Sequence, residues 1–388
     1  MTAIGGTLLV TGTTIGGGML ALPVLTSLGG FFPSLLIYFL CWIFMACTGL
    51  LFLELCLHYG EGANIVTLAD KTLGPLGKIT AWGLYLFLFY CLTIAYVVGC
   101  GNLLTEFSQQ AIPENVGPIS FVLLFAPFVF IGSKLIGNFN IFLMLGLGAL
   151  FFAFIFFGHP YVNTKLLMRR EWLLSLIALP IAFTSFAYQG IIPTLVSYMD
   201  FDARKIRTAI LVGSFLPFIA YVIWQWLILG IVPVEGPHGL AEALAEGQNA
   251  VYPLKHTINN PFLYVVGEYF AFLALLTSFF GVTLGLFDFL ADGLKIKKTP
   301  KGKLFLCLIV FVPPVIIGSL HPDIFLVALD YAGGYGCALL LGLMPILMVW
   351  SARYYLKIET AEQLPGGKLI LVILLLFVLF ELACEIII

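Results

Sequence analysis

The chain has 388 residues, of which 61% are hydrophobic and only 10% are charged. Soluble globular proteins carry about 25% charged and about 45–50% apolar residues, so this composition excludes a soluble enzyme. It also excludes a disordered chain, and the formal net charge of −2 leaves no basic face for nucleic acid. The apolar residues come in long unbroken runs, which disfavours a membrane β-barrel. The sequence is therefore that of an all-α integral membrane protein with many spans.

Apolar runs that approach the length of a bilayer-spanning helix, about 20 residues, predict eleven transmembrane helices. The longest polar connection, residues 234–260, is too short for a soluble domain, and it contains two short amphipathic pieces, residues 239–246 and 249–258. We expect this connection to be either a lid over the outer face or plain surface. The predicted spans are residues 3–28, 31–57, 80–105, 118–132, 136–158, 172–198, 208–232, 261–290, 303–319, 334–352 and 368–388.

Basic residues predict the orientation, because loops on the cytoplasmic side are enriched in Lys and Arg. With the N-terminus in the cytoplasm and the loops alternating, fourteen of the eighteen basic residues lie inside. We therefore expect a multi-pass protein of the plasma membrane, the inner membrane in a bacterium, with its N-terminus cytoplasmic and its C-terminus outside. The four basic residues placed outside are Lys165, Arg169, Arg170 and Lys255.

Two spans are expected to be discontinuous. The first contains Gly16, Gly17 and Gly18, and each glycine costs about 1 kcal/mol relative to alanine in a helix. The sixth has a polar centre between Pro180 and Gly190. Unwound backbone within a bilayer persists only where it is buried in protein or lines a cavity, and half-helix ends there bind charged groups. Glycines also serve close helix packing, but two breaks that each open a block of five spans favour an inverted repeat.

The predicted organisation is a first five-helix repeat over residues 1–158, a second over residues 172–353, and an eleventh helix over residues 366–388. Such an arrangement is typical of secondary transporters that work by alternating access. A channel, which needs a polar ring or symmetric filter, and an intramembrane enzyme, which needs catalytic residues at depth, are distant alternatives. The eight cysteines form no CxxC pair and lie in apolar context, so we expect buried thiols, no metal centre and no cofactor.

Four segments carry a resemblance to a known family: residues 5–23 (GGTLLVTGTTIGGGMLALP), 183–186, 193–200 and 277–288. They resemble the aromatic amino acid permeases, the TyrP/Mtr type of the hydroxy and aromatic amino acid permease family, and the similarity covers nearly the whole chain. The resemblance implies a LeuT-type fold of the APC superfamily, with a 5+5 inverted repeat and discontinuous helices 1 and 6. It also implies import of an aromatic amino acid, with tyrosine as the first candidate and tryptophan or phenylalanine as alternatives. We expect the protein to function as a monomer. Its expected partners are the aromatic amino acid and membrane lipid, and we expect no binding of nucleic acid.

Backbone groups at the two predicted breaks are expected to bind the charged groups of the substrate. The backbone N–H groups of the three consecutive glycines are expected to hold its carboxylate, because the start of the second half-helix faces it. Carbonyl groups around Thr14, Phe183 and Thr184 are expected to hold its ammonium group.

The side chain of the substrate is expected to lie in an aromatic pocket. By resemblance, Tyr90 or Tyr96 in the third span caps the cavity, and Gln189 is expected to hydrogen bond the polar end of the substrate. The predicted substrate-binding residues are Thr14, Ile15, Gly16, Gly17, Gly18, Met19, Tyr96, Phe183, Thr184, Ser185, Phe186, Tyr188, Gln189 and Phe280.

The coupling ion has two candidate sites. Glu54 lies deep in the second span, where a carboxylate either carries a proton or is a permanent partner of a basic residue. The resemblance implies proton symport, although the fifth span lacks the lysine that proton-coupled relatives can carry. Sodium coupling through the hydroxyls of Thr277 and Ser278 in the eighth span is the alternative.

Overall fold

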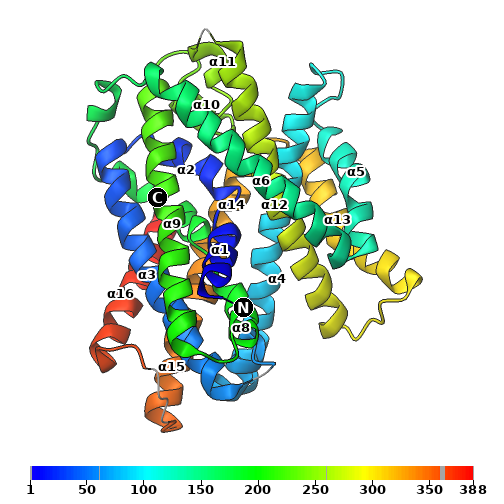
Figure 1. Ribbon diagram of the computed structural model, residues 1–388, viewed down its shortest axis with the longest axis vertical. Helices are drawn as coiled ribbons and strands as arrows, with labels where there is room; N and C mark the ends of the chain where they lie inside the picture. The colour runs from blue at the N-terminus through cyan, green and yellow to red at the C-terminus, as the bar shows by residue number, and fades with distance from the viewer. Residues whose placement is uncertain (1, 61, 259, 359–362, 388) are drawn as a thin grey trace.

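A computed structural model describes residues 2–60, 62–258, 260–358 and 363–387 of the chain, and these residues form helices and no β-strand (Figure 1). Within them, nine helices are long and apolar enough to cross a membrane, and the bent pair α1–α2 makes a tenth span. The fourth predicted span corresponds to α5 (Gly117–Ile131), which has 15 residues and falls short of that length. The all-helical prediction is confirmed, whereas the count of eleven spans is not.

The continuous spans follow the predicted runs in order. α4 begins at Ile65, ahead of the predicted third span, and it consists of two helical stretches that meet at a kink at Gly74, where a φ of 76° suits glycine. The tenth also starts earlier, at Phe325, and passes through a π-helix. The spans are α3 (Phe31–Tyr59), α4 (Ile65–Phe107), α6 (Ser133–Gly158), α9 (Ala203–Ile231), α12 (Pro261–Gly293), α13 (Pro300–Leu320), α14 (Phe325–Tyr331) with π-helix η5 (Ala332–Leu343), α15 (Met344–Trp350) and η6 (Ser351–Tyr355), and α16 (Gly367–Ile387).

Both predicted breaks are present. The first span consists of α1 (Ala3–Thr14) and α2 (Gly18–Thr26), which meet at a bend of 54°. The sixth span consists of η3 (Leu174–Ala178) and α7 (Leu179–Ser185), a non-helical stretch at residues 186–188, and then η4 (Gln189–Ile191) and α8 (Ile192–Tyr198). Short half-helices therefore lie where the sequence concentrates glycine, proline and polar residues.

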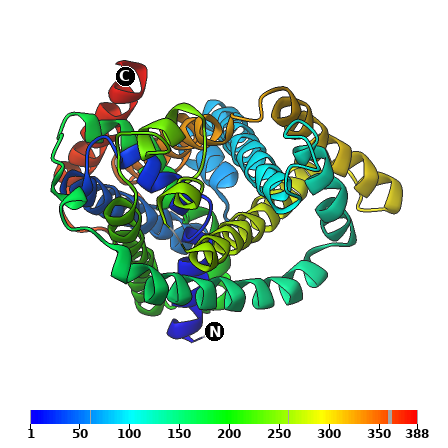
Figure 2. The ribbon, with the colours of Figure 1, turned by 90° about the horizontal axis from the view of Figure 1, so that it is seen from above.

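The broken spans pack against each other and against long helices that support them. α1 lies along α9, α2 packs on α7, and α7 packs on η5, while α4 packs on α12. Figures 1 and 2 show α16 at one side of this bundle and α13 at the opposite side. The breaks are thereby enclosed by protein on several sides, as unwound backbone in a bilayer requires.

The two ends of the bundle carry different connections. α10 (Leu240–Ala245) and α11 (Leu254–Thr257) cover one end (Figure 1), and they correspond to the two amphipathic pieces of the polar connection. Two ion pairs lie at this end, Arg169 with Glu235 at 2.7 Å and Lys255 with Glu106 at 2.9 Å. The basic residues Arg169 and Lys255, which the loop analysis assigns to one side of the membrane, thus share one end of the molecule.

A buried ion pair joins α3 to η6 near the other end. The side chains of Glu54 and Arg353 are 1% and 4% exposed. Arg353 Nε donates to Glu54 Oε1 at 2.8 Å, and Arg353 Nη2 donates to Glu54 Oε2. Of the two roles predicted for Glu54, proton carrier or permanent partner of a basic residue, the structure shows the pairing with a basic residue.

Removal of one partner of this pair is expected to destabilise the protein strongly. Arg353→Ala removes the guanidinium group from the buried Glu54 carboxylate, and breaking a buried ion pair in this way costs about 3–5 kcal/mol. The measurement is the free energy of unfolding in mixed micelles. The matched control is Lys298→Ala, because Lys298 pairs with Asp288 at 2.9 Å on the surface and exposed pairs contribute about 0–1 kcal/mol. Equal small losses in both variants would contradict the assignment.

Candidate functional site

The break between α1 and α2 exposes three backbone amides. Gly16 and Gly17 lie outside both helices and Gly18 is the first residue of α2, so none of their N–H groups has an intrahelical acceptor. Among the described residues, these amides also have no other hydrogen-bond acceptor. They lie at the N-terminal end of α2, where the helix dipole is positive.

Glycine is needed at this break because other side chains approach its backbone closely. A Cβ on Gly17 would lie 2.7 Å from Tyr96 Cε1 and 2.8 Å from Leu275 Cδ2. A Cβ on Gly16 would overlap Ser278 Oγ, and the Tyr96 hydroxyl lies beside the same position. Tyr96 from α4 and Ser278 from α12 therefore flank the unwound backbone.

The two breaks meet at Gly18 and Ser185. A Cβ on Gly18 would overlap the Ser185 side chain, so the start of α2 touches the end of α7 directly. Ser185 Oγ donates to Ile181 O at 2.7 Å within α7. The start of α2, which carries the Gly18 amide, thus contacts the last residue of α7.

One hydroxyl from α9 joins the C-terminal ends of both half-helices. Tyr221 Oη lies 2.8 Å from Thr14 O, at the end of α1, and 2.8 Å from Ser185 O, at the end of α7. A tyrosine hydroxyl has a single hydrogen to donate, so it satisfies only one of these carbonyls at a time. Tyr221 is fully buried.

This arrangement matches the two charged groups of a free amino acid. Amides at the positive end of α2 suit a carboxylate, and the carbonyls of Thr14 and Ser185 at the negative ends of α1 and α7 suit an ammonium group. Both sets belong to backbone, so they recognise the part that all amino acids share. Side-chain selectivity must come from neighbouring residues.

Phe183 and Phe280, which were predicted to line the site, lie in aromatic clusters elsewhere. The Phe183 ring packs on Phe44 at 5.0 Å between ring centroids, and on Phe377 of α16 at 6.0 Å. The Phe280 ring packs on Phe128 of α5 at 5.7 Å. The structure does not bring either ring to the group around Gly17. Phe186 does lie close, because its ring meets that of Tyr221 at 5.3 Å.

Tyr188 and Gln189 connect the second break to α3. Gln189 Oε1 accepts from the Tyr188 amide at 3.0 Å, and Gln189 Nε2 donates to Thr48 Oγ1 at 3.1 Å and to Met45 O at 3.3 Å. Tyr188 Oη donates to Met45 O at 3.2 Å. The polar atoms that were expected to meet a substrate are therefore already bonded to the protein, and they hold residues 186–188 against α3.

The remaining predicted residues are Ile15, Met19, Thr184, Thr277 and Ser278. Ile15 lies in the first break and Met19 is buried in α2. Thr184 Oγ1 donates to Leu329 O of α14 at 3.0 Å. The hydroxyls of Thr277 and Ser278 donate to Ala274 O at 3.0 Å within α12, which leaves their lone pairs available to a cation.

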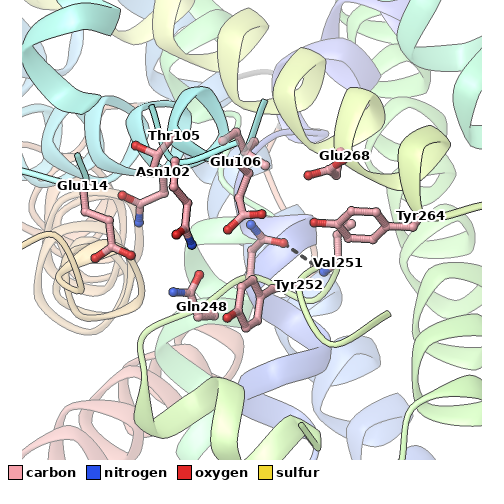
Figure 3. A pocket seen from close by; sticks show the side chains of 12 residues that line it. Asn102, Thr105, Glu106, Glu114, Gln248, Val251, Tyr252, Tyr264 and Glu268 are labelled. Atoms are coloured by element: carbon pink, nitrogen blue, oxygen red, sulfur yellow. Dashed lines mark hydrogen bonds between the residues drawn. The ribbon is translucent and has the colours of Figure 1, made fainter. Parts of the chain in front are cut away.

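A polar pocket lies at the end covered by α10 and α11 (Figure 3). Asn102 and Glu106 of α4 line it, together with Glu268 of α12 and with Gln248, Asn249, Val251 and Tyr252. Asn102 follows Tyr96 by six residues, roughly 9 Å along the helix. The connection also touches α2, since the Ala250 amide donates to Leu20 O at 3.0 Å.

The sequence pattern missed Tyr221 and Glu381. Tyr221 lies in an apolar helix, and its two partners lie far away in the chain, so no local signal marks it. Glu381 had a signal, because Leu371, Leu374, Val378 and Glu381 recur at helical spacing and all four are buried on one face of α16. That spacing places Glu381 inside the protein.

Comparison with known proteins agrees with this geometry. The sequence profile of the tryptophan/tyrosine permease family matches residues 1–385. The chain belongs to this family. It is 33% identical over 383 residues to tyrosine-specific transport system 1 of Haemophilus influenzae, which covers 96% of the chain and 93% of that relative. It is 29% identical over 399 residues to a tryptophan-specific transport protein of the same species, which covers 99% of the chain and 95% of that relative.

The fold of this permease is of the LeuT type. The crystal structure of MhsT in complex with L-phenylalanine matches it with a TM-score of 0.66 and 15% identity, and the match covers 98% of both chains. The predicted fold class, with discontinuous helices 1 and 6, is thereby confirmed, as are an integral membrane location and the expectation that the protein is not an enzyme. The division of the repeats at residues 158 and 172 stays a prediction.

Removal of the Tyr221 hydroxyl is expected to destabilise the protein without substrate more than the protein with substrate. Tyr221→Phe leaves Thr14 O and Ser185 O without their donor, and an unsatisfied buried group costs about 1–3 kcal/mol. An ammonium group at the same carbonyls would supply the missing donor. Thermal unfolding with and without saturating tyrosine or tryptophan measures the difference. Tyr355→Phe, at a tyrosine that is 78% exposed, is the control. An equal loss in both conditions would limit Tyr221 to a structural role.

A side chain at Gly17 is expected to abolish substrate binding while the protein stays folded in the membrane. Gly17→Val would enter the space that Tyr96 and Leu275 occupy, and overpacking costs typically about 1–3 kcal/mol. Binding of labelled amino acid and membrane expression are the measurements. Gly148→Val on α6 is the control, because a Cβ there meets nothing within 4 Å. Normal affinity in Gly17→Val would show that the glycine serves packing alone.

Proposed function

We propose that this permease imports an aromatic amino acid, with tyrosine preferred, by proton-driven symport and alternating access. The observation that carries the proposal is the convergence of three free amides with the carbonyls of Thr14 and Ser185 at the two helix breaks. Relatives named for tyrosine and tryptophan transport support the aromatic class, and the higher identity to the tyrosine system favours tyrosine.

In this proposal the substrate carboxylate binds the amides of residues 16–18. The ammonium group takes its place at Thr14 O and Ser185 O, beside the Tyr221 hydroxyl. The aromatic ring packs between Tyr96 and Phe186, each of which borders this group. Closure of the site then depends on movement of α1 and α7, the half-helices that end at these carbonyls.

The end covered by α10 and α11 is proposed to face outward. The distribution of basic residues supports this orientation, with fourteen on the opposite side and four on this one. The N-terminus is then cytoplasmic, the C-terminus lies outside, and the protein works as a monomer in the plasma membrane.

Sodium coupling is the second candidate. Ser278 Oγ lies against Gly16 in the first break, and Thr277 is its neighbour on α12. Hydroxyl and carbonyl oxygens are suitable ligands for a hard cation. α6 (Ser133–Gly158) also lacks a charged residue within its apolar length beyond Lys134.

Transport in proteoliposomes tests the substrate and the ion together. Labelled tyrosine uptake is expected to be competed by tyrosine, tryptophan and phenylalanine, and not by glutamine, serine or leucine. An inward pH gradient without sodium is expected to drive accumulation, whereas a sodium gradient at clamped pH is expected to have no effect. Thr277→Ala is expected to leave pH-driven uptake intact.

Three outcomes would overturn parts of this function. Competition by branched-chain or hydroxy amino acids without competition by aromatic ones would reject the substrate class. Uptake driven only by sodium, and lost in Thr277→Ala, would establish the second candidate. An ohmic current without saturation would indicate a channel.

A further inference from the structure

α16 carries a carboxylate that is completely buried and has no hydrogen-bond partner in the part of the chain that the structure describes. Glu381 is 0% exposed, and both of its carboxylate oxygens lack a hydrogen-bond partner. It lies on the inward face of α16. This helix lies at the side of the bundle opposite α13 (Figure 2). An ionisable group within a membrane span is costly, so its presence marks a candidate functional site.

Among the described residues, the charged neighbours of Glu381 are two further carboxylates and no basic group. Glu385 is one turn further along α16, and Asp330 of α14 has one buried oxygen without a hydrogen-bond partner. The Glu385 carboxylate lies directly against Gly334 of η5, where a Cβ would overlap it. Three carboxylates this close cannot all remain ionised in an apolar environment, so protonation of the cluster is the way to neutralise it.

Other titratable groups around Glu381 are uncharged thiols and one phenol. α7, α15 and η3, which also pack on α16, have no titratable residue. The groups that face Glu381 are Cys41 of α3, Cys337 and Tyr335 of η5, Asp330 of α14, and Cys384 and Glu385 of α16 itself.

Geometry favours a proton over a metal ion at this cluster. Within the described part of the chain, no group of three His, Cys, Asp or Glu residues is placed to hold a metal ion. A proton needs only one carboxylate oxygen, and Glu381 has two that are unoccupied by donors. Glu54, the carboxylate that the sequence offered as a proton carrier, is already paired with Arg353.

The cluster is connected to the substrate site through α14 and η5. Thr184 of α7 donates to Leu329 O, next to Asp330. Gly333 of η5 packs so closely on Pro180 O of α7 that a Cβ would overlap it. α7 ends at Ser185, whose carbonyl is part of the substrate site. A change of charge at the cluster therefore acts on a segment in direct contact with the half-helix that binds substrate.

We propose that Glu381, with Asp330 and Glu385 as its neighbours, is the proton-binding site of this symporter. H⁺ adds to a Glu381 carboxylate oxygen to form the neutral acid, and the same O–H bond breaks on the other side of the membrane. The neutral acid allows α14–η5 to pack on α16 and α7. Ionisation repels Asp330 and Glu385 and shifts that segment. This inference rests on the proposed proton symport and names the residue that performs it.

The test separates substrate exchange from proton coupling. Purified protein in proteoliposomes is assayed for counterflow of labelled tyrosine without a pH gradient, and for accumulation and proton uptake with one. Glu381→Gln mimics the neutral acid permanently. We expect counterflow to persist at a reduced rate, its pH dependence to flatten, and accumulation above the outside concentration to be lost. Glu381→Asp is expected to restore accumulation with a shifted pH profile.

Asp288→Asn is the matched control, because it removes an exposed carboxylate paired with Lys298, and it is expected to behave as wild type. pH-driven accumulation at the wild-type level in Glu381→Gln would overturn the proposal. A folded Glu381→Gln protein that binds no substrate would also overturn it, since the role would then be structural. Absence of tyrosine counterflow in the wild type would instead reject the proposed function. That outcome is distinct from a loss of proton coupling in the Glu381 variant alone.

Discussion

Hydrocarbon offers no hydrogen bonds, so a backbone group released by the breaks at residues 15–17 and 186–188 needs a partner in the protein or in a bound molecule. Tyr221 supplies a donor for the carbonyls, and the Gln189 side chain accepts from the Tyr188 amide. Among the described residues, the amides of residues 16–18 remain without an acceptor. The rest of the bundle, with α4 and α12 flanking the first break and α9 joining both, holds these groups in place.

The arrangement leaves the carbonyls of Thr14 and Ser185 short of hydrogen-bond donors and the amides of residues 16–18 short of acceptors. One Tyr221 hydrogen serves two carbonyls, while three amides serve no acceptor. A molecule that carries both an ammonium and a carboxylate corrects both deficits at once. An analogue without the amine corrects only one, so in the proposed function the backbone itself would distinguish amino acids from the corresponding keto acids.

Local sequence was sufficient for the spans and their breaks, since Gly16–Gly18 and the stretch from Pro180 to Gly190 are poor continuous helix in any context. It was not sufficient for the direction of individual side chains. Phe183 is on the correct half-helix, but its ring turns toward Phe44, away from the break. Tyr221 acquires its role only when α9 meets α1 and α7, which depends on contacts 207 and 36 residues apart. Glu381 was readable from its spacing with Leu374 and Val378, because a carboxylate on the buried stripe of α16 has to face protein.

The ion pair between Glu54 and Arg353 has a mechanical consequence for the tenth span. Arg353 fixes η6 to α3, and the Ser351 hydroxyl adds a hydrogen bond to Thr72 O of α4. The same span carries Asp330 at its other end, and the Asp330 Oδ1 atom has no hydrogen-bond partner among the described residues. In the proposed coupling, a change of charge at this end would therefore rotate the span about its anchor at η6. The displacement would be largest at α14, which packs against the half-helix α7.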